Sequence, residues 1–344
     1  MTATERSEQL KPILLDCTLR DGGNQNNWQF TAQDVTTIVS TLDEAGIDII
    51  EVGYRGGSGS ADTTAAGASA HCDPGYLAAL PEVRNAELAV MVVPTECPVD
   101  ALDDLADSPI GLVRIASYPW NFDAVPGYVD AVRRLGLRVG VNLMAVSYVD
   151  LAELETLAKT IAADEPDVVC VADSFGALTP EEVTARIEVL RGVLGCRIGL
   201  HGHNNLGLAA ANALAALGAG ATTLDASLCA MARGAGNLAT EQAAAFLTAS
   251  TRYACTLDSA VLGRAARYVA DQVLPRPMPL TAVEIAAGLN DHHYYFVPHI
   301  EAAAAEHGLD AWEIGRRLGR TRPRKVRAEL VQAVCQEMIE ERNR

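Results

Sequence analysis

Short apolar runs rich in Val, Ile and Leu alternate along most of the chain with longer stretches whose apolar residues recur at helical spacing. Eight such runs are predicted strands, and their continuous apolar character is typical of parallel strands that are covered on both faces. Strands and helices in this alternation predict a closed (β/α)8 TIM barrel, with an open doubly wound sheet as the alternative. The runs span residues 13–18, 47–54, 88–93, 112–116, 138–145, 168–172, 197–203 and 222–227.

Local signals mark the helix ends between these runs. Thr31 and Asp34 form the pattern of an N-terminal capping pair, and Gly46 is a C-terminal stop before the second run. Thr-Pro-Glu-Glu at 179–182 has the same capping pattern, with proline at the first helical position. No G-x-G-x-x-G follows any of the runs, which weakens the dinucleotide-binding form of the alternative sheet.

The pattern changes after Gly236, where the strand-like runs end. Residues 240–344 show helical spacing alone, and the Ala-rich stretch 301–308 ends in a glycine stop. We therefore predict a TIM-barrel catalytic domain over residues 1–274. The helical region 275–344 is predicted to be an appendage that serves assembly or partner binding and forms a lid over the site.

Composition narrows the classes of partner and compartment. The chain has 344 residues and a formal net charge of −17 at pH 7. Nucleic acids and anionic membrane surfaces select basic patches, so we expect neither as a partner. The eight cysteines are scattered without a C-x-x-C pair, which is typical of reduced core thiols. With no apolar leader and no apolar run approaching about 18 residues, the sequence predicts a cytoplasmic protein.

Two histidines mark the end of the seventh strand. Because alternate residues of a strand point to the same face, His201 and His203 are expected to project together from its C-terminal end. Barrel enzymes place their sites at that end, and Asp21 follows the first strand, which only the eighth separates from the seventh. These three side chains are predicted to hold one divalent cation, and Asn237, after the eighth strand, offers a further oxygen.

The donor set indicates the class of cation. Mixed oxygen and nitrogen ligands with open positions suit Mn²⁺, Mg²⁺, Co²⁺ or Fe²⁺ better than a structural zinc. Mn²⁺ is the cation that we expect, with Mg²⁺, Co²⁺ or Zn²⁺ as alternatives. Each of these residues also has an interpretation without a metal. The two histidines would then be polar residues at a strand end, and Asn237 would be an amide that caps a loop.

Three short motifs stand in order along the chain: Leu-Asp-Cys-Thr-Leu-Arg-Asp-Gly at 15–22, His-Gly-His-Asn at 201–204 and Arg-Gly-Ala-Gly-Asn at 233–237. Together they resemble the DRE-TIM (HMGL-like) metallolyase superfamily. Its members include 4-hydroxy-2-oxovalerate aldolases, hydroxymethylglutaryl-CoA lyases and isopropylmalate or homocitrate synthases. The segments 224–231 and 298–309 look most like the 4-hydroxy-2-oxovalerate (pyruvate) aldolase branch.

The resemblance implies a role for each matching residue. Asp21, His201 and His203 would be the metal ligands. Arg20 would bind substrate and stabilise the enolate that forms when the carbon–carbon bond breaks or is made, and its alternative is an ordinary loop salt bridge. Ser174 stands where the aldolases hold the carboxylate of the 2-oxo acid, although a loop hydroxyl at that position is equally consistent with a structural role.

Two departures from the aldolase pattern concern the aldehyde side of the site. The pyruvate aldolases have a histidine where this chain has Asn24, and an amide cannot act as a general base near pH 7. We keep Asn24 as a substrate-binding residue. The aldolases also have a tyrosine before the helix that begins near residue 298, where this chain has His292, His293 and Tyr294. One of these three is predicted to replace the missing histidine, and the alternative is that they pack or lie on the surface.

These features predict a divalent-metal-dependent class II aldolase that forms or cleaves a 4-hydroxy-2-oxo acid from an aldehyde and a 2-oxo acid, pyruvate or 2-oxobutyrate. A Claisen-type acyl-CoA condensing enzyme or lyase is the alternative. Against it, Gly23 stands where the synthases carry a glutamate. A non-catalytic relative that binds a metal or a partner is a third interpretation, disfavoured by the intact Arg20, Asp21 and histidine set. The resemblance also implies an aldehyde dehydrogenase partner, or a homodimer or higher oligomer, assembled through residues 275–344.

Overall fold

Eight parallel strands form a closed barrel in chain order, with β8 pairing back onto β1. The computed structural model describes residues 9–58, 65–278 and 280–343. The predicted TIM barrel is therefore confirmed, and the open sheet is excluded. The strands are β1 (Ile13–Asp16), β2 (Ile49–Arg55), β3 (Glu87–Val92), β4 (Ile110–Ser117), β5 (Arg138–Leu143), β6 (Val168–Asp173), β7 (Arg197–Gly202) and β8 (Thr223–Ala226).

The first and seventh strands end earlier than the sequence predicts. The first strand was expected to reach Thr18, but it ends at Asp16, whose carboxylate accepts the backbone N–H of Thr18 at 2.9 Å and starts a turn. The seventh strand ends at Gly202, and His203 forms an isolated bridge with Asn237 instead. Asp21 and His203 therefore lie beyond the strand ends, whereas His201 stays on β7.

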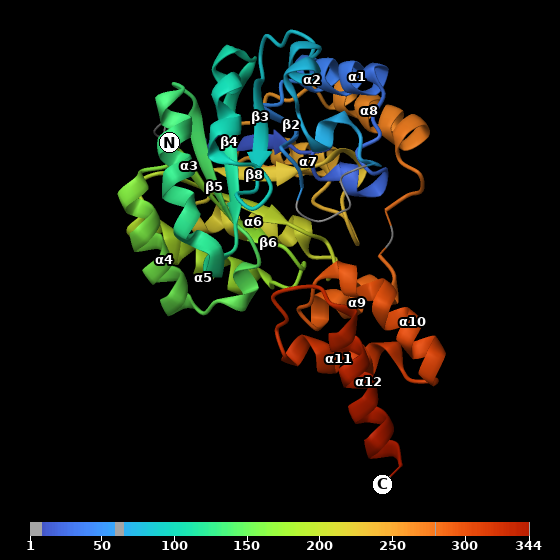
Figure 1. Cartoon of the computed structure of the whole chain (residues 1–344). Helices are drawn as coiled ribbons and strands as arrows, with labels where there is room; N and C mark the ends of the chain where they lie inside the picture. The colour runs from blue at the N-terminus through green and yellow to red at the C-terminus, as the bar shows by residue number, and fades with distance from the viewer. Residues whose placement is uncertain (1–8, 59–64, 279, 344) are drawn as a thin grey trace, which may run out of the picture.

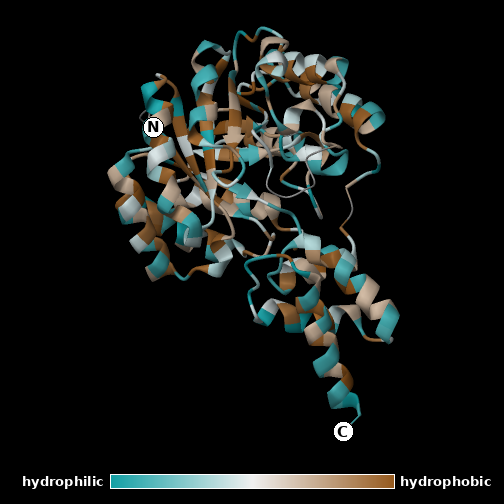
Figure 2. Ribbon diagram, in the orientation of Figure 1, coloured by the Kyte–Doolittle hydropathy of each residue, from teal (hydrophilic) through white to brown (hydrophobic). Residues whose placement is uncertain are grey.

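Helices surround the barrel and turn their apolar sides toward it, so that the apolar strands lie inside (Figures 1 and 2). Both predicted capping boxes are present, at Thr31 with Asp34 and at Thr179 with Glu182. Each satisfies backbone N–H groups that a helix start leaves without partners. The helices are α1 (Ala32–Glu44), α2 (Pro74–Ala78), α3 (Val125–Arg134), α4 (Leu151–Asp164), α5 (Pro180–Val193), α6 (Ala209–Ala219), α7 (Thr240–Ala249) and α8 (Ser259–Tyr268).

The last four helices form a separate lobe beside the barrel (Figure 1). They are α9 (Ala282–Leu289), α10 (Val297–His307), α11 (Ala311–Arg320) and α12 (Ala328–Arg342). Phe296, Ile300, Ile314, Leu318 and Val331 belong to the apolar cluster of this lobe, which is distinct from the barrel core. A helical C-terminal region is thus present, while the domain boundary at residue 274 stays a prediction. Within the described part of the chain, no helix has the length and apolar character needed to cross a membrane.

Candidate functional site

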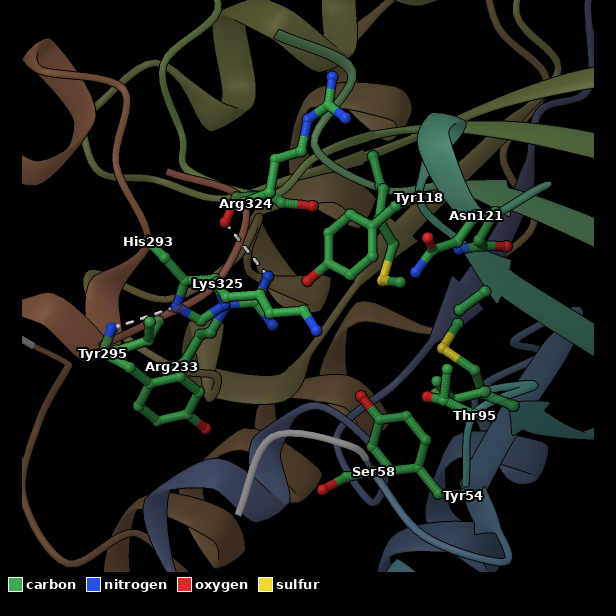
Figure 3. Close-up of a pocket in the computed structure, with 18 of the residues that line it drawn as sticks. Tyr54, Ser58, Thr95, Tyr118, Asn121, Arg233, His293, Tyr295, Arg324 and Lys325 are labelled. Atoms are coloured by element: carbon green, nitrogen blue, oxygen red, sulfur yellow. Dashed lines mark hydrogen bonds between the residues drawn. The ribbon is translucent and has the colours of Figure 1, made fainter. Parts of the chain in front are cut away.

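A cavity of about 920 Å³ lies between the barrel mouth and the helical lobe. The barrel contributes Arg20 after β1, Ser174 after β6 and His201 on β7. The loop before α10 contributes His293 and Tyr295, and Figure 3 shows these two across the cavity from residues of the barrel loops. The volume is at the upper end of the range that small-molecule sites occupy.

The three predicted metal ligands lie together, and one of them, His201, lines this cavity. His201 Nε2 lies 3.5 Å and His203 Nε2 3.8 Å from Asp21 Oδ2. Asn237 donates from Nδ2 to the same oxygen at 2.9 Å. All four side chains are buried. Both ring nitrogens of His203 and the amide oxygen of Asn237 have no hydrogen-bond partner among the described residues.

These unsatisfied atoms fit a cation. A buried polar atom without a partner is costly, so unpartnered ring nitrogen and amide oxygen atoms beside a carboxylate indicate a ligand there. Burial alone would raise the pKa of Asp21, but Arg20, His201, His203 and Arg233 together hold it well below its usual range. Burial and Arg233 hold the pKa of His203 well below its ordinary value, which keeps the ring neutral. An ionised carboxylate and a neutral imidazole are the forms in which these groups bind metals.

His201 connects the cluster to the inside of the barrel. Its Nδ1 lies 3.2 Å from Asp225 Oδ2, which orients Nε2 toward Asp21. Burial lowers the pKa of His201, but hydrogen bonding with Asp21 and Asp225 outweighs burial and raises it. A carboxylate behind a histidine is a common support for metal ligands, because it fixes the tautomer and the ring orientation.

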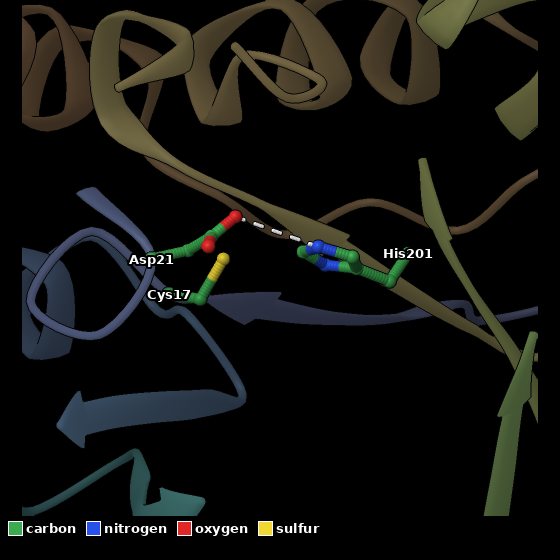
Figure 4. Close-up of side chains that lie close together, drawn as sticks. All are labelled: Cys17, Asp21 and His201. Atoms are coloured by element: carbon green, nitrogen blue, oxygen red, sulfur yellow. Dashed lines mark ion pairs between the residues drawn. The ribbon is translucent and has the colours of Figure 1, made fainter. Parts of the chain in front are cut away.

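Cys17 is a further neighbour of the cluster and is not among the predicted ligands. Its sulfur and ligand atoms of Asp21 and His201 all lie within 4.8 Å of one another (Figure 4). The thiol lies 3.2 Å from the carbonyl oxygen of Ala226, to which it donates. Burial raises the pKa of Cys17 well above its ordinary value, so the group is a thiol and a poorer ligand than His203.

A ring of buried charges holds Arg20 in place. Arg20 Nε donates to Glu51 Oε2 at 2.6 Å, and Arg20 Nη1 lies 3.1 Å from Asp21 Oδ1. Arg114 links two further carboxylates: its Nη1 lies 3.1 Å from Glu51 Oε1, and its Nη2 lies 2.5 Å from Asp225 Oδ2. Glu51, Arg114 and Asp225 are not among the predicted site residues, although a charged residue within each of three apolar strands is a signal that could have found them.

Arg20 retains one unused donor. Nη1 also lies 3.3 Å from the hydroxyl oxygen of Tyr54, whereas the buried Nη2 has no partner among the described residues. The side chain is 3% exposed and lines the cavity. A guanidinium that lines a cavity and retains an unpartnered N–H group is suited to an anionic oxygen.

Ser174 and Asn24 are the other two predicted substrate-binding residues. Ser174 Oγ accepts the backbone N–H of Ala145 at 2.8 Å, which leaves its own hydrogen for a ligand in the cavity. Asn24 donates to Asp21 and accepts the hydroxyl of Tyr295 at 2.7 Å. Asn24 thus links the helical lobe to a predicted metal ligand and does not itself line the cavity.

Of the three residues proposed to replace the missing histidine, the structure brings only His293 to the described lining of the cavity. His292 lies in the helical lobe, with its ring edge-on to Phe296 at 6.2 Å. Tyr294 lies over Gly234, while Tyr295, which was not singled out, lines the cavity. Adjacent residues diverge because the short 3-10 turn Tyr294–Phe296 rotates them to different sides.

The hydrogen bonds of His293 decide what its ring can do. Nδ1 accepts the backbone N–H of Tyr295 at 3.2 Å. Burial, with Arg233 and His292, lowers the pKa of His293 to about 3, so the ring is neutral near pH 7. A neutral imidazole that accepts at one nitrogen carries its hydrogen on the other. His293 is therefore a hydrogen-bond donor at Nε2, and the expected role as a proton acceptor does not follow from this geometry.

The space around Gly23 is too small for the glutamate that the synthases carry at this position. A Cβ atom at this position would lie 2.0 Å from Cδ1 of the Trp28 ring, so no larger residue fits. Trp28 is buried and donates from its indole nitrogen to the carbonyl oxygen of Arg20 at 2.7 Å. The indole therefore supports the Arg20 loop in the space that a synthase-type side chain would need.

Comparisons with known proteins agree with this geometry. The family model described as HMGL-like matches residues 11–269. The chain is 35% identical over 330 residues to oxaloacetate decarboxylase of Mycobacterium tuberculosis, covering 93% of this chain and 94% of that protein. It is 33% identical over 333 residues to 4-hydroxy-2-oxovalerate aldolase of Pelotomaculum thermopropionicum, covering 96% and 97%. The HMG-CoA lyase structure of Bacillus subtilis superposes with a TM-score of 0.64 over 78% of this chain and 95% of that one, at 18% identity, and shares the fold.

Proposed function

Because this chain belongs to the HMGL-like family, we propose that it is a divalent-metal-dependent aldolase that joins or splits a 2-oxo acid and an aldehyde. Its relatives make it a carbon–carbon lyase, and the substrates, pyruvate or 2-oxobutyrate with an aldehyde, are our proposal. The observation that carries the proposal is the unpartnered Nη2 of Arg20, held at the cavity beside Asp21 and the two histidines.

Arg20 stabilises the charge that appears on the 2-oxo acid. In cleavage, the hydroxyl group of the substrate releases its proton to solvent and becomes the aldehyde oxygen, while the electrons of the breaking carbon–carbon bond move into the 2-oxo acid fragment and leave an enolate. Protonation of the enolate carbon then gives the free 2-oxo acid. Glu51 and Asp21 fix the guanidinium before substrate arrives, so its free N–H needs no reorientation when the enolate oxygen becomes negative.

The remaining groups hold the substrate from both ends. Ser174 donates its hydroxyl hydrogen to the carboxylate of the 2-oxo acid. His293 donates from Nε2 to the aldehyde oxygen, which carries negative charge as the bond forms or breaks. We propose Asp21, His201 and His203 as the ligands of a divalent cation, Mn²⁺ first, with the Asn237 amide oxygen as a fourth donor. When bound there, the cation supplies further positive charge beside the 2-oxo acid oxygens.

Isotope exchange tests this proposal directly. The metal-loaded enzyme is incubated with pyruvate in ²H₂O, and loss of the methyl proton signal is followed by NMR, with and without EDTA. Exchange that stops on chelation and returns with Mn²⁺ supports enolate formation at this site. The proposal is contradicted if exchange continues after exhaustive chelation, or if the enzyme exchanges neither pyruvate nor 2-oxobutyrate.

Decarboxylation of a 2-oxo dicarboxylic acid is a second candidate, favoured because neither Asn24 nor His293 offers a base for aldol cleavage. Aldol cleavage must remove the hydroxyl proton, yet Asn24 cannot accept it and Nδ1 of His293 is occupied. Loss of CO₂ from the same carbon gives the same enolate and needs no proton acceptor there. The relative from Mycobacterium tuberculosis is named for that reaction. Pyruvate release from oxaloacetate, measured against the metal-only background, distinguishes the two reactions.

We further propose that the helical lobe binds a partner, an aldehyde dehydrogenase, in a reducing cytoplasmic compartment. Leu289 and Trp312 are exposed apolar side chains of this lobe, 60% and 39% accessible. None of the eight cysteines forms a disulfide. Leu289→Glu with Trp312→Glu is expected to abolish co-purification of a dehydrogenase from the native host. A homodimer in light scattering that the double variant dissociates would assign the surface to self-association instead.

A further inference from the structure

Positive charge gathers around the cavity of an otherwise acidic protein. Arg20, Arg233, Arg324 and Lys325 all line it, and its described lining contains no Asp or Glu. The chain as a whole has 44 acidic and 27 basic residues, so such an excess runs against its composition. A cavity lined by one sign of charge concentrates ligands of the opposite sign.

These cations differ in how far the protein already neutralises them. Arg20 is paired with Glu51 and Asp21. Arg324 lies over the ring of Trp120, 4.8 Å from its centroid, and this contact is sufficient to explain its position. The nearest carboxylate oxygen to Arg233 is Asp21 Oδ1 at 3.9 Å, and Lys325 has no acidic partner among the described residues. Arg233 and Lys325 therefore have unused capacity for an anion.

Arg233 and Lys325 come from different parts of the chain and meet at one side of the cavity. Arg233 follows β8 and is anchored by a bond from Nη2 to the carbonyl oxygen of Ser174 at 3.2 Å. Lys325 belongs to the segment between α11 and α12, on the helical lobe. Figure 3 shows the two side chains on the side formed by His293 and Tyr295, facing Tyr54, Thr95 and Asn121. It is also the side on which the proposed function places the aldehyde oxygen, at His293.

We infer that the aldehyde-derived part of the substrate carries its own anionic group, a carboxylate or a phosphate, which Arg233 and Lys325 bind. The inference rests on the proposed function, because it assigns the 2-oxo acid to Arg20 and Ser174. A simple 2-oxo acid has one carboxylate, and those two residues with the cation site suffice for it. The cavity of about 920 Å³ also has room for a substrate much larger than a five-carbon acid.

Matched aldehydes test the inference. Condensation with pyruvate is measured for 4-oxobutanoate against butanal, which have equal carbon number, and for glyceraldehyde 3-phosphate against glyceraldehyde. The wild type is expected to prefer the charged member of one pair by about 10- to 100-fold in kcat/KM, the range of one hydrogen bond to a charged group. The pair that shows the preference identifies carboxylate or phosphate.

Variants assign the preference to the two side chains. Lys325→Gln and Arg233→Gln are each expected to bring the charged-to-neutral ratio close to one. Arg327→Gln is the matched control: Arg327 lies two residues from Lys325, is exposed and does not line the cavity, so the ratio should stay at the wild-type value.

Three outcomes overturn the inference. One is a wild type with no charge preference in either pair, and another is a preference that both variants keep. The third is an equal loss for charged and neutral aldehydes in both variants, which would place the two residues on the 2-oxo acid. Deuterium exchange into pyruvate by the wild type distinguishes failure of the proposed function from failure of this inference. If the wild type shows no exchange, the proposed function fails. If it shows exchange but no preference for a charged aldehyde, only this inference fails.

Discussion

The two halves of the cavity are built in different ways. On the barrel side, Arg20, Asp21 and His201 are buried, stand on or directly after strands, and each has at least two polar contacts within the buried charge network. On the lobe side, His293 and Lys325 come from loops between helices, and Lys325 is exposed. The rigid half suits a step that tolerates no displacement, the stabilisation of an enolate. The loop-built half suits the choice of the second substrate.

The largest effect is expected from removing a metal ligand. His201→Ala deletes a ligand and the link to Asp225, so turnover should fall to the uncatalysed background and bound metal should be lost. Metal content per chain and exchange into pyruvate measure this, with circular dichroism to confirm folding. His307→Ala, on the far end of α10, is the control. Full turnover of His201→Ala would remove the cation site from the mechanism.

Arg20→Ala should follow, with a loss of about 10² to 10³ in kcat, as when one preorganised oxyanion donor is removed. Arg20→Lys should not restore the rate, since a single ammonium cannot contact Glu51 and Asp21 while also presenting a free donor to the cavity. Steady-state kinetics with a lactate dehydrogenase couple for pyruvate give both values. A near-normal kcat in both variants would exclude the proposed role.

On the lobe side, His293→Ala should lower kcat for the aldehyde reaction by about 10- to 100-fold, through loss of a donor to a charged oxygen. His293→Gln keeps a donor and should retain more activity, which a proton-accepting role would not allow. Because the pKa of His293 is lowered to about 3, its ring stays neutral above that pH, and no loss of rate near pH 6.5 should be traceable to it. His292→Ala, in the apolar lobe, should reduce thermal stability and leave kcat unchanged.

The smallest effect is expected at the tyrosine pair. Tyr295→Phe removes a neutral hydrogen bond to Asn24 and should cost about 2- to 10-fold in kcat, with no change in metal content. Tyr294→Phe should have no effect, because that side chain does not line the cavity. Equal effects of the two substitutions on kcat would show that turnover depends on the conformation of the loop and not on the Tyr295 hydroxyl.

The same division explains what the sequence predicted. Strand periodicity and the His-x-His spacing located the barrel and the cluster of Asp21, His201 and His203, because strand geometry fixes where those side chains point. Glu51 and Asp225 were missed, since the charged network depends on which strands meet across a closed barrel. In the lobe, His292 and Tyr294 were chosen over Tyr295, because the direction of a side chain in a one-turn 3-10 segment depends on packing that no periodicity records.

The central claim, that the barrel side forms the enolate and the lobe side handles the aldehyde, is tested most directly by one partial reaction. Deuterium exchange into pyruvate is measured by NMR without aldehyde for wild type, Arg20→Ala and His293→Ala. The account predicts that Arg20→Ala loses exchange by about 10² or more. It predicts that His293→Ala exchanges at close to the wild-type rate even though its aldehyde reaction is impaired. Parallel loss of exchange in His293→Ala, or normal exchange in Arg20→Ala, would contradict the account.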